Sequence, residues 1–198
     1  DTRQRGHVGF GIDDDEIGRN VGISFEASLQ LFKYMPFIYE GQRHQELRTA
    51  MARAVAPFAA AHPIFERRVS QAVAAMRRDG AFDLVKQFSG TLMFDVLGDL
   101  MELPESEREE IRPLSNISWA LDPTVSAKKR EIAEATIARC MAPLTAHVRR
   151  MLAQPGSTLI HGIDRSLPPD EPERVIATAN LLAVVLVMGN DAVAGCIN

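Results

Sequence analysis

The sequence predicts an all-α protein, and three observations carry this prediction. Apolar residues recur at helical spacing through most of the chain from residue 24 onward. No run of useful length alternates apolar and polar residues as a half-buried strand would, and no internal repeat is present. The 198 residues are 46% hydrophobic and 24% charged, which is typical of a chain that buries a core rather than of a disordered one.

Seven segments have the spacing of an amphipathic or buried helix. They cover residues 24–34, 42–56, 62–78, 82–101, 106–119, 126–154 and 175–189. Pro36, Pro57 and Pro155 each follow such a segment and end it, since proline cannot continue a helix. We expect an N-cap at Ser24, a capping box formed by Ser106 and Glu109, and a kink at Pro143.

The two ends of the sequence differ in character. Residues 1–22 are rich in glycine and aspartate, which predicts a loop, and they contain no initiator methionine or signal segment. Residues 175–189 form the longest apolar run, about 15 residues. This run is too short for a membrane span and contains Thr178 and Asn180, so it predicts a buried core helix. Because the chain stops soon afterwards, we expect it to be part of a longer protein.

Composition argues against several classes of protein. The net charge of −4 argues against binding to nucleic acid, because phosphate contacts need a basic surface. Cys140 and Cys196 cannot build a disulfide framework, fit a reducing compartment, and are expected to be small core residues. No histidine lies in a metal-binding motif, so we predict no metal site made of protein ligands alone. No phosphate-binding loop, nucleophile elbow or dinucleotide fingerprint is present.

His44 and Arg48 are the first candidate site residues. They stand four positions apart in HQELR, and therefore on one face of the predicted helix. Two cationic donors one turn apart suit two neighbouring carboxylates, and a guanidinium binds a carboxylate particularly well. The alternative interpretation is a pair of solvated surface side chains.

The second candidate is the sequence Gly189-Asn190-Asp191. Glycine inside a helix costs about 1 kcal/mol relative to alanine, and an acid in so apolar a segment is costly to bury unless it is paired or functional. Glycine allows a group to approach the backbone closely, and aspartate can relay protons. The alternative is that these residues form the turn that ends the helix, with Asp191 exposed.

Four segments, in their order and separation, resemble the cytochrome P450 family of haem-thiolate monooxygenases. EGQRHQELRTAMARAVAP resembles the C helix, FDLVKQFSGTLMFDVLGDLMELPESERE the E helix and the turn into F, and LLAVVLVMGNDAVAGCIN the I helix. The long segment 126–154, followed by QPGSTLIHGI, resembles the G helix and what comes after it. The resemblance implies one partial domain with four parts: a B–C loop region (1–40), a C-like helix (41–57), D- to H-like helices (58–171) and a truncated I-like helix (172–198).

The resemblance also implies roles for the candidate residues. His44 and Arg48 would contact the haem propionates. Gly189 would lie where a groove leaves room for dioxygen or substrate, and Asp191 would be the acid of the proton-delivery pair. Ala192 stands where the family usually has a threonine and has no hydroxyl, so proton delivery would need Asn190, an ordered water, a substrate hydroxyl or peroxide. Two further departures are Met188, where the family usually has a small residue, and Val55, where it often has phenylalanine.

The implied function is haem-dependent oxidation of a small hydrophobic molecule by a cytoplasmic enzyme that binds neither membrane nor nucleic acid. Electrons would come from a ferredoxin or a flavin reductase. The loop that carries the axial cysteine is not within this sequence, so the chain alone lacks the thiolate ligand. Five further apolar residues would line either the substrate pocket or the ordinary hydrophobic core: Phe25, Phe32, Phe37, Trp119 and Leu121.

Two other classes remain open. One is a haem-free remnant of the same fold that acts as a binding or interaction module, which the missing thiolate and Ala192 would favour. The other is an unrelated helical bundle, such as the ligand-binding domain of a regulator. No helix-turn-helix or basic segment accompanies it.

Overall fold

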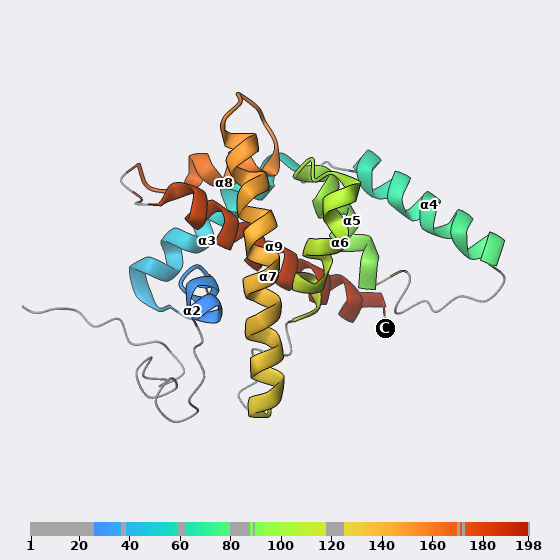
Figure 1. The fold of residues 1–198 in the computed structure, drawn as a ribbon. Helices are drawn as coiled ribbons and strands as arrows, with labels where there is room; N and C mark the ends of the chain where they lie inside the picture. The colour runs from blue at the N-terminus through green and yellow to red at the C-terminus, as the bar shows by residue number, and fades with distance from the viewer. Residues whose placement is uncertain are drawn as a thin grey trace, which may run out of the picture.

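The structure is a computed structural model that describes residues 26–36, 39–58, 62–79, 88, 90–117, 125–169, 171 and 173–197, with only the backbone for residues 43, 62, 79, 116 and 190–197. Within these residues the chain is helical and contains no strand, so the all-α prediction is confirmed (Figure 1). The elements in order are α2 (Glu26–Phe32), α3 (Gly41–Val55), η2 (Ala56–Phe58), α4 (His62–Asp79), α5 (Gly90–Leu100), α6 (Glu105–Ile111), η4 (Arg112–Asn116), α7 (Ala127–Leu152), α8 (Leu159–Ser166) and α9 (Arg174–Ile197).

Helix α9 is the centre of the molecule. It crosses α7 and runs from α8 on one side to α5 on the other (Figure 1). Its residues from 177 to 184 are all buried, as the apolar run predicts. Asn180 is accommodated there because its side-chain amide donates to the carbonyl of Ile176 at 2.9 Å. No helix in the described part of the chain is both long and apolar enough to cross a membrane.

Helix α7 packs against α9 through one apolar stripe. Its N-cap is Ser126, whose hydroxyl accepts from the amide of Lys129. The stripe recurs every three or four residues and consists of Ala133, Ile137, Cys140, Leu144 and Val148, all buried. The helix continues through Pro143 to Leu152, and the kink expected at that proline stays a prediction.

An ion cluster fixes α4 and α6 to α5. The carboxylate of Asp99 accepts hydrogen bonds from Arg67 and Arg108, at 2.8 and 2.7 Å, and from Arg68. Arg108 is buried and also donates to the carbonyl of Leu103 at 3.0 Å. Burial disfavours ionisation of Asp99, but the hydrogen bonds from these arginines outweigh it and hold its pKa well below the usual range.

The capping box predicted at Ser106 and Glu109 is wrong. Helix α6 begins one residue earlier, with Pro104 as its N-cap, so Ser106 lies inside the first turn. The segment also tightens into the 3₁₀ helix η4 after Ile111, because Pro113 has no amide to donate to an α-helical bond. The predicted cap Ser24, the side chain of Cys196 and the aromatic residues Phe25, Phe37 and Trp119 lie outside the described part of the structure, as does Leu121.

Candidate functional site

His44 and Arg48 lie one turn apart on α3. The helix begins at Gly41, whose φ of +64° is accessible to glycine at little cost and turns the chain from Glu40 into the helix. Arg48 is exposed and forms no ion pair with any carboxylate that the structure describes. His44 is half-buried, and its Nδ1 lies 2.8 Å from the carbonyl oxygen of Pro36.

The partner of His44 fixes which ring nitrogen remains open. A carbonyl can only accept, so Nδ1 of His44 carries the proton and donates it to Pro36. This leaves Nε2 without a described partner. The buried rings of His147 and His161 differ, because each of them uses both nitrogens in hydrogen bonds within the protein. Among these three histidines, His44 alone keeps a nitrogen for a ligand.

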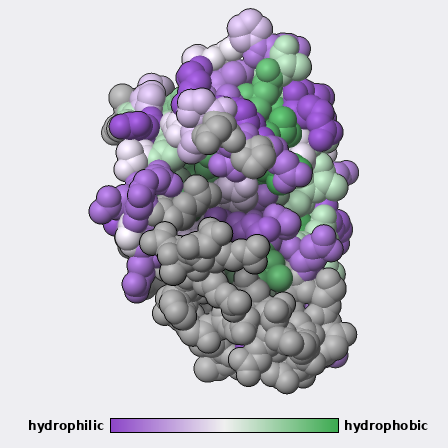
Figure 2. Space-filling view, turned by 90° about the vertical axis from the view of Figure 1, so that its left-hand side faces the viewer, coloured by the Kyte–Doolittle hydropathy of each residue, from purple (hydrophilic) through white to green (hydrophobic). Residues whose placement is uncertain are grey.

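The exposed face of α3 is amphipathic. Val55 follows Arg48 after two turns on the same helix face, and 42% of its surface is exposed. Hydrophobic side chains are exposed among hydrophilic ones on the side of the molecule that carries α2, α3 and α8 (Figure 2). The Arg48 guanidinium, with Val55 beside it and His44 Nε2 as a second donor when that nitrogen is also protonated, fits an apolar ligand that carries carboxylates, as haem does with its propionates.

Small residues hold α3 tightly against α8. A Cβ added to Gly162 of α8 would lie 3.1 Å from the carbonyl oxygen of Ala54, which belongs to the α3 backbone. Ala50 and Ala54 on this side of α3 are both buried. Arg48 and Val55 lie on another face of α3, and both are exposed in the described part of the structure.

The second candidate set lies within α9 and not at its end. The helix continues to Ile197, so the alternative that Gly189-Asn190-Asp191 forms the terminating turn is wrong. Gly189 faces α5, where an added Cβ would lie 3.3 Å from Cδ1 of Leu97 and 3.8 Å from Met93. Of Asn190, Asp191 and Ala192 the structure describes only the helical backbone.

Met188 directly precedes this set on α9, and its side chain is exposed. It is 38% exposed, whereas Leu186 and Val187 before it are buried. Position 192 lies one turn further on the same helix face as Met188. The sequence already contained this i, i+4 relation, but which face of α9 is open depends on the packing of α5, which only the structure shows.

The two sets of residues lie in different parts of the fold. Helix α3 packs against α8 beside the first part of α9, whereas Met188 and Gly189 lie in the part that reaches α5 (Figure 1). A single ligand would have to extend along α9 to touch both sets.

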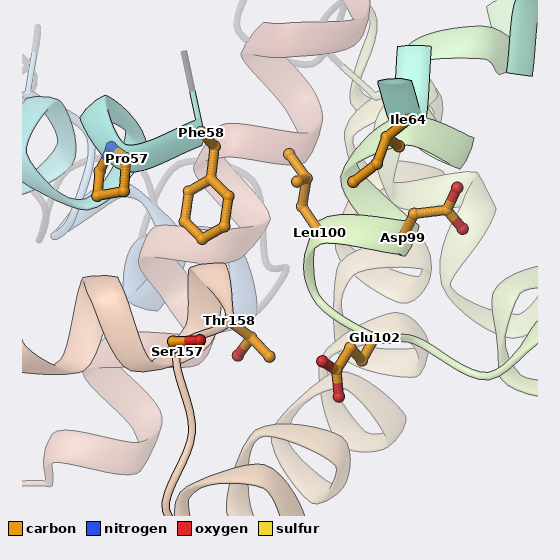
Figure 3. Close-up of a pocket in the computed structure, with 8 residues that line it drawn as sticks. All are labelled: Pro57, Phe58, Ile64, Asp99, Leu100, Glu102, Ser157 and Thr158. Atoms are coloured by element: carbon orange, nitrogen blue, oxygen red, sulfur yellow. The ribbon is translucent and has the colours of Figure 1, made fainter. Parts of the chain in front are cut away.

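A cavity of about 300 Å³ lies elsewhere, between η2, α4, the α5–α6 turn and the start of α8 (Figure 3). Its lining consists of Pro57, Phe58, Ile64, Asp99, Leu100, Glu102, Ser157 and Thr158. None of the predicted site residues is among them. The carboxylate of Asp99 is occupied by its three arginines, so the cavity and the candidate site are separate. No cluster of three or more metal-ligating side chains occurs among the described residues.

The arrangement of these helices is that of the cytochrome P450 fold, of which the chain forms a part. CYP105P1, in complex with filipin I, is 24% identical and superimposes with a TM-score of 0.67 over 80% of this chain and 40% of its own. CYP105P2 of Streptomyces peucetius, in complex with a biphenyl compound, is 23% identical, with a TM-score of 0.67 over 82% of this chain and 40% of its own.

P450BioI, in complex with an acyl carrier protein ligated to hexadec-9Z-enoic acid, is 17% identical, with a TM-score of 0.68 over 82% of this chain and 43% of its own. The chain thus spans about two-fifths of the length of the structures it matches. No family model matches the sequence, and a search of curated proteins gave no match.

Proposed function

We propose that this chain supplies one side of the haem site of a cytochrome P450-type oxidoreductase that oxidises a small hydrophobic molecule. The observation that carries the proposal is the open pair on α3, since Arg48 lacks a described ion-pair partner and His44 has one free ring nitrogen. The P450 fold of the chain supports it. The C-like and I-like assignment of α3 and α9 is part of the proposal.

In this proposal Arg48 holds one propionate of haem through a charge-assisted hydrogen bond, and His44 holds the other through Nε2 when that nitrogen also carries a proton. The haem, when bound, supplies the oxygen-activating chemistry. Its thiolate ligand does not come from Cys140, which is buried in α7 with its sulfur 3.3 Å from the carbonyl oxygen of Glu110. Burial also raises the pKa of the Cys140 thiol, which keeps it protonated.

In this proposal the residues of α9 deliver protons and set the room that is left for the substrate. Asp191 donates the proton, and the side-chain amide of Asn190 can hydrogen-bond a water that carries the proton onward. Ala192 has no hydroxyl, so a water or a substrate hydroxyl completes the path, or peroxide serves as the oxidant. Gly189 lets α9 approach α5, and Met188 limits the size of the substrate on the open side.

The partners of the proposal are the substrate and an electron donor of ferredoxin or flavin reductase type, with the enzyme in the cytoplasm. Acyl carrier protein is the partner of one matched P450, so an acyl chain is one hydrophobic substrate that the proposal includes.

A haem-free binding module is the second candidate function. Ala192 favours it, because this position cannot supply the hydroxyl that the usual proton delivery needs. The two candidates differ in one property, which is whether the full-length protein binds haem.

The experiment measures haem release from the full-length protein to an excess of a haem-scavenging apoprotein. Arg48→Gln should release haem about tenfold faster, because it removes one charge-assisted hydrogen bond worth about 1–2 kcal/mol. Arg53→Gln is the matched control, since Arg53 is also exposed on α3, and should not change the rate. Equal rates for both variants and the wild type would contradict the assigned role of Arg48.

A further inference from the structure

Helix α2 is tied to α7 by a single carboxylate. Glu134 of α7 accepts from the backbone amide of Ala27 at 2.6 Å, from the amide of Ser28 at 2.9 Å and from the hydroxyl of Ser28 at 2.5 Å. The first amides of a helix have no partner within it and need an acceptor. Here that acceptor comes from another helix, more than 100 residues away in the sequence.

The other end of the same segment meets the candidate site. The chain leaves α2 through Tyr34 and Met35, both buried, and reaches Pro36. The carbonyl of Pro36 accepts the Nδ1 proton of His44. The hydroxyl of Tyr34 donates to Glu171 at 3.3 Å, which adds a second attachment near this end. A short segment, α2 followed by the buried Tyr34 and Met35, therefore connects Glu134 with the ring of His44.

We propose that Glu134 is a positioning residue for His44. By holding α2 against α7, Glu134 keeps the carbonyl of Pro36 in place, and that carbonyl keeps a proton on Nδ1 and orients the His44 ring so that Nε2 faces the exposed side of α3. The inference rests on the proposed function only for the ligand of Nε2, and not for the link between Glu134 and His44.

Two variants of α7 separate this role from general stability. Glu134→Gln keeps the shape of the side chain but presents an NH₂ group to the donors on α2. The side chain therefore loses part of its hydrogen bonding to Ala27 and Ser28. Glu131→Ala is the matched control, because Glu131 is an exposed carboxylate one turn away on the same helix, with no described partner.

The first measurement follows the Nδ1–H proton of His44 by ¹⁵N NMR, and it needs no haem. In the wild type and in Glu131→Ala this proton should be protected from exchange by its bond to Pro36. In Glu134→Gln it should exchange at least tenfold faster, together with the amides of Ala27 and Ser28. An unchanged His44 proton in Glu134→Gln would overturn the inference, whether or not the protein binds haem.

The second measurement is a double-mutant cycle on haem release from the full-length protein. Glu134→Gln should speed release about threefold when residue 44 is histidine and have no effect in a His44→Ala background. Equal acceleration in both backgrounds would show that Glu134 does not act through His44 and would overturn the inference. If the wild type bound no haem, the proposed function would fail, while the NMR result would still decide the role of Glu134.

Discussion

At the scale of single residues, the hydrogen-bond partners of each histidine define what its ring can do. His161 donates from Nε2 to the carbonyl of Gln154 and accepts at Nδ1 from the hydroxyl of Thr158. His147 donates to the carbonyl of Met101, and its other nitrogen faces Arg150. Both rings are buried and fully used, which makes them structural. His44 differs in keeping Nε2 open, and this difference is the reason for assigning it to a ligand.

Gly156 allows the His161 ring to occupy its place. A Cβ at Gly156 would lie 2.5 Å from Cε1 of that ring, which two hydrogen bonds prevent from moving away. We therefore expect Gly156→Ala to lower the free energy of unfolding by about 1–3 kcal/mol, as overpacking of a well-packed site does. Urea denaturation measures the loss. In a His161→Ala background the same substitution should cost little, and an equal cost in both backgrounds would contradict the contact.

At the scale of elements, the Asp99 cluster should make the attachment of α4 and α6 to α5 depend on pH. The pKa of Asp99 is lowered in the folded protein, so its contribution is present above the pKa of about 4 in the unfolded chain and is lost as the pH falls below it. Asp99→Asn should lower the free energy of unfolding by about 3 kcal/mol at pH 7, because it leaves the buried Arg108 and the partly buried Arg68 without their carboxylate.

The loss should be about 1 kcal/mol smaller at pH 3, because the wild type is weakened there by about 1.4 kcal/mol for each pH unit below 4. Urea denaturation at the two pH values checks this dependence. The control is Glu109→Gln, whose exposed ion pair with Arg112 should contribute less than about 0.5 kcal/mol. A cost of Asp99→Asn that is the same at both pH values would argue against the cluster.

Long periodic helices could be predicted from the sequence, whereas contacts between distant segments could not. The expected ranges 42–56, 62–78 and 126–154 differ from α3, α4 and α7 by at most two residues at each end, because apolar spacing and flanking prolines are local signals. The cap of α2 by Glu134 and the three arginines on Asp99 join residues 9 to 107 positions apart. No local pattern encodes such pairs.

For the candidate site, the i, i+4 pair on α3 was visible in the sequence, but the state of its members was not. Arg48 is exposed, and His44 is hydrogen-bonded through only one of its ring nitrogens. Both properties depend on the position of Pro36 and on the packing of α8. In the same way, the position of α5 decides that Gly189 faces the interior and Met188 the open side.

At the scale of the whole molecule, α9 organises both candidate sets. Its buried first part packs against α8, and α8 packs against α3. Its last part carries residues 188–192 beyond α7 (Figure 1). A ligand that extends along α9 could therefore meet Arg48 and His44 of α3 with its carboxylates and the exposed side chain of Met188 with its apolar surface. That the full-length protein binds haem at this site is the central claim of the proposed function.

The most direct test of that claim is the absorption spectrum of the full-length protein after reconstitution with haem, reduced and exposed to carbon monoxide. The proposed function predicts one haem bound per chain, with the Soret band typical of thiolate ligation, and weaker retention in Arg48→Gln than in Arg53→Gln. A folded full-length protein that stays colourless would contradict the claim and would leave the haem-free binding module as the function.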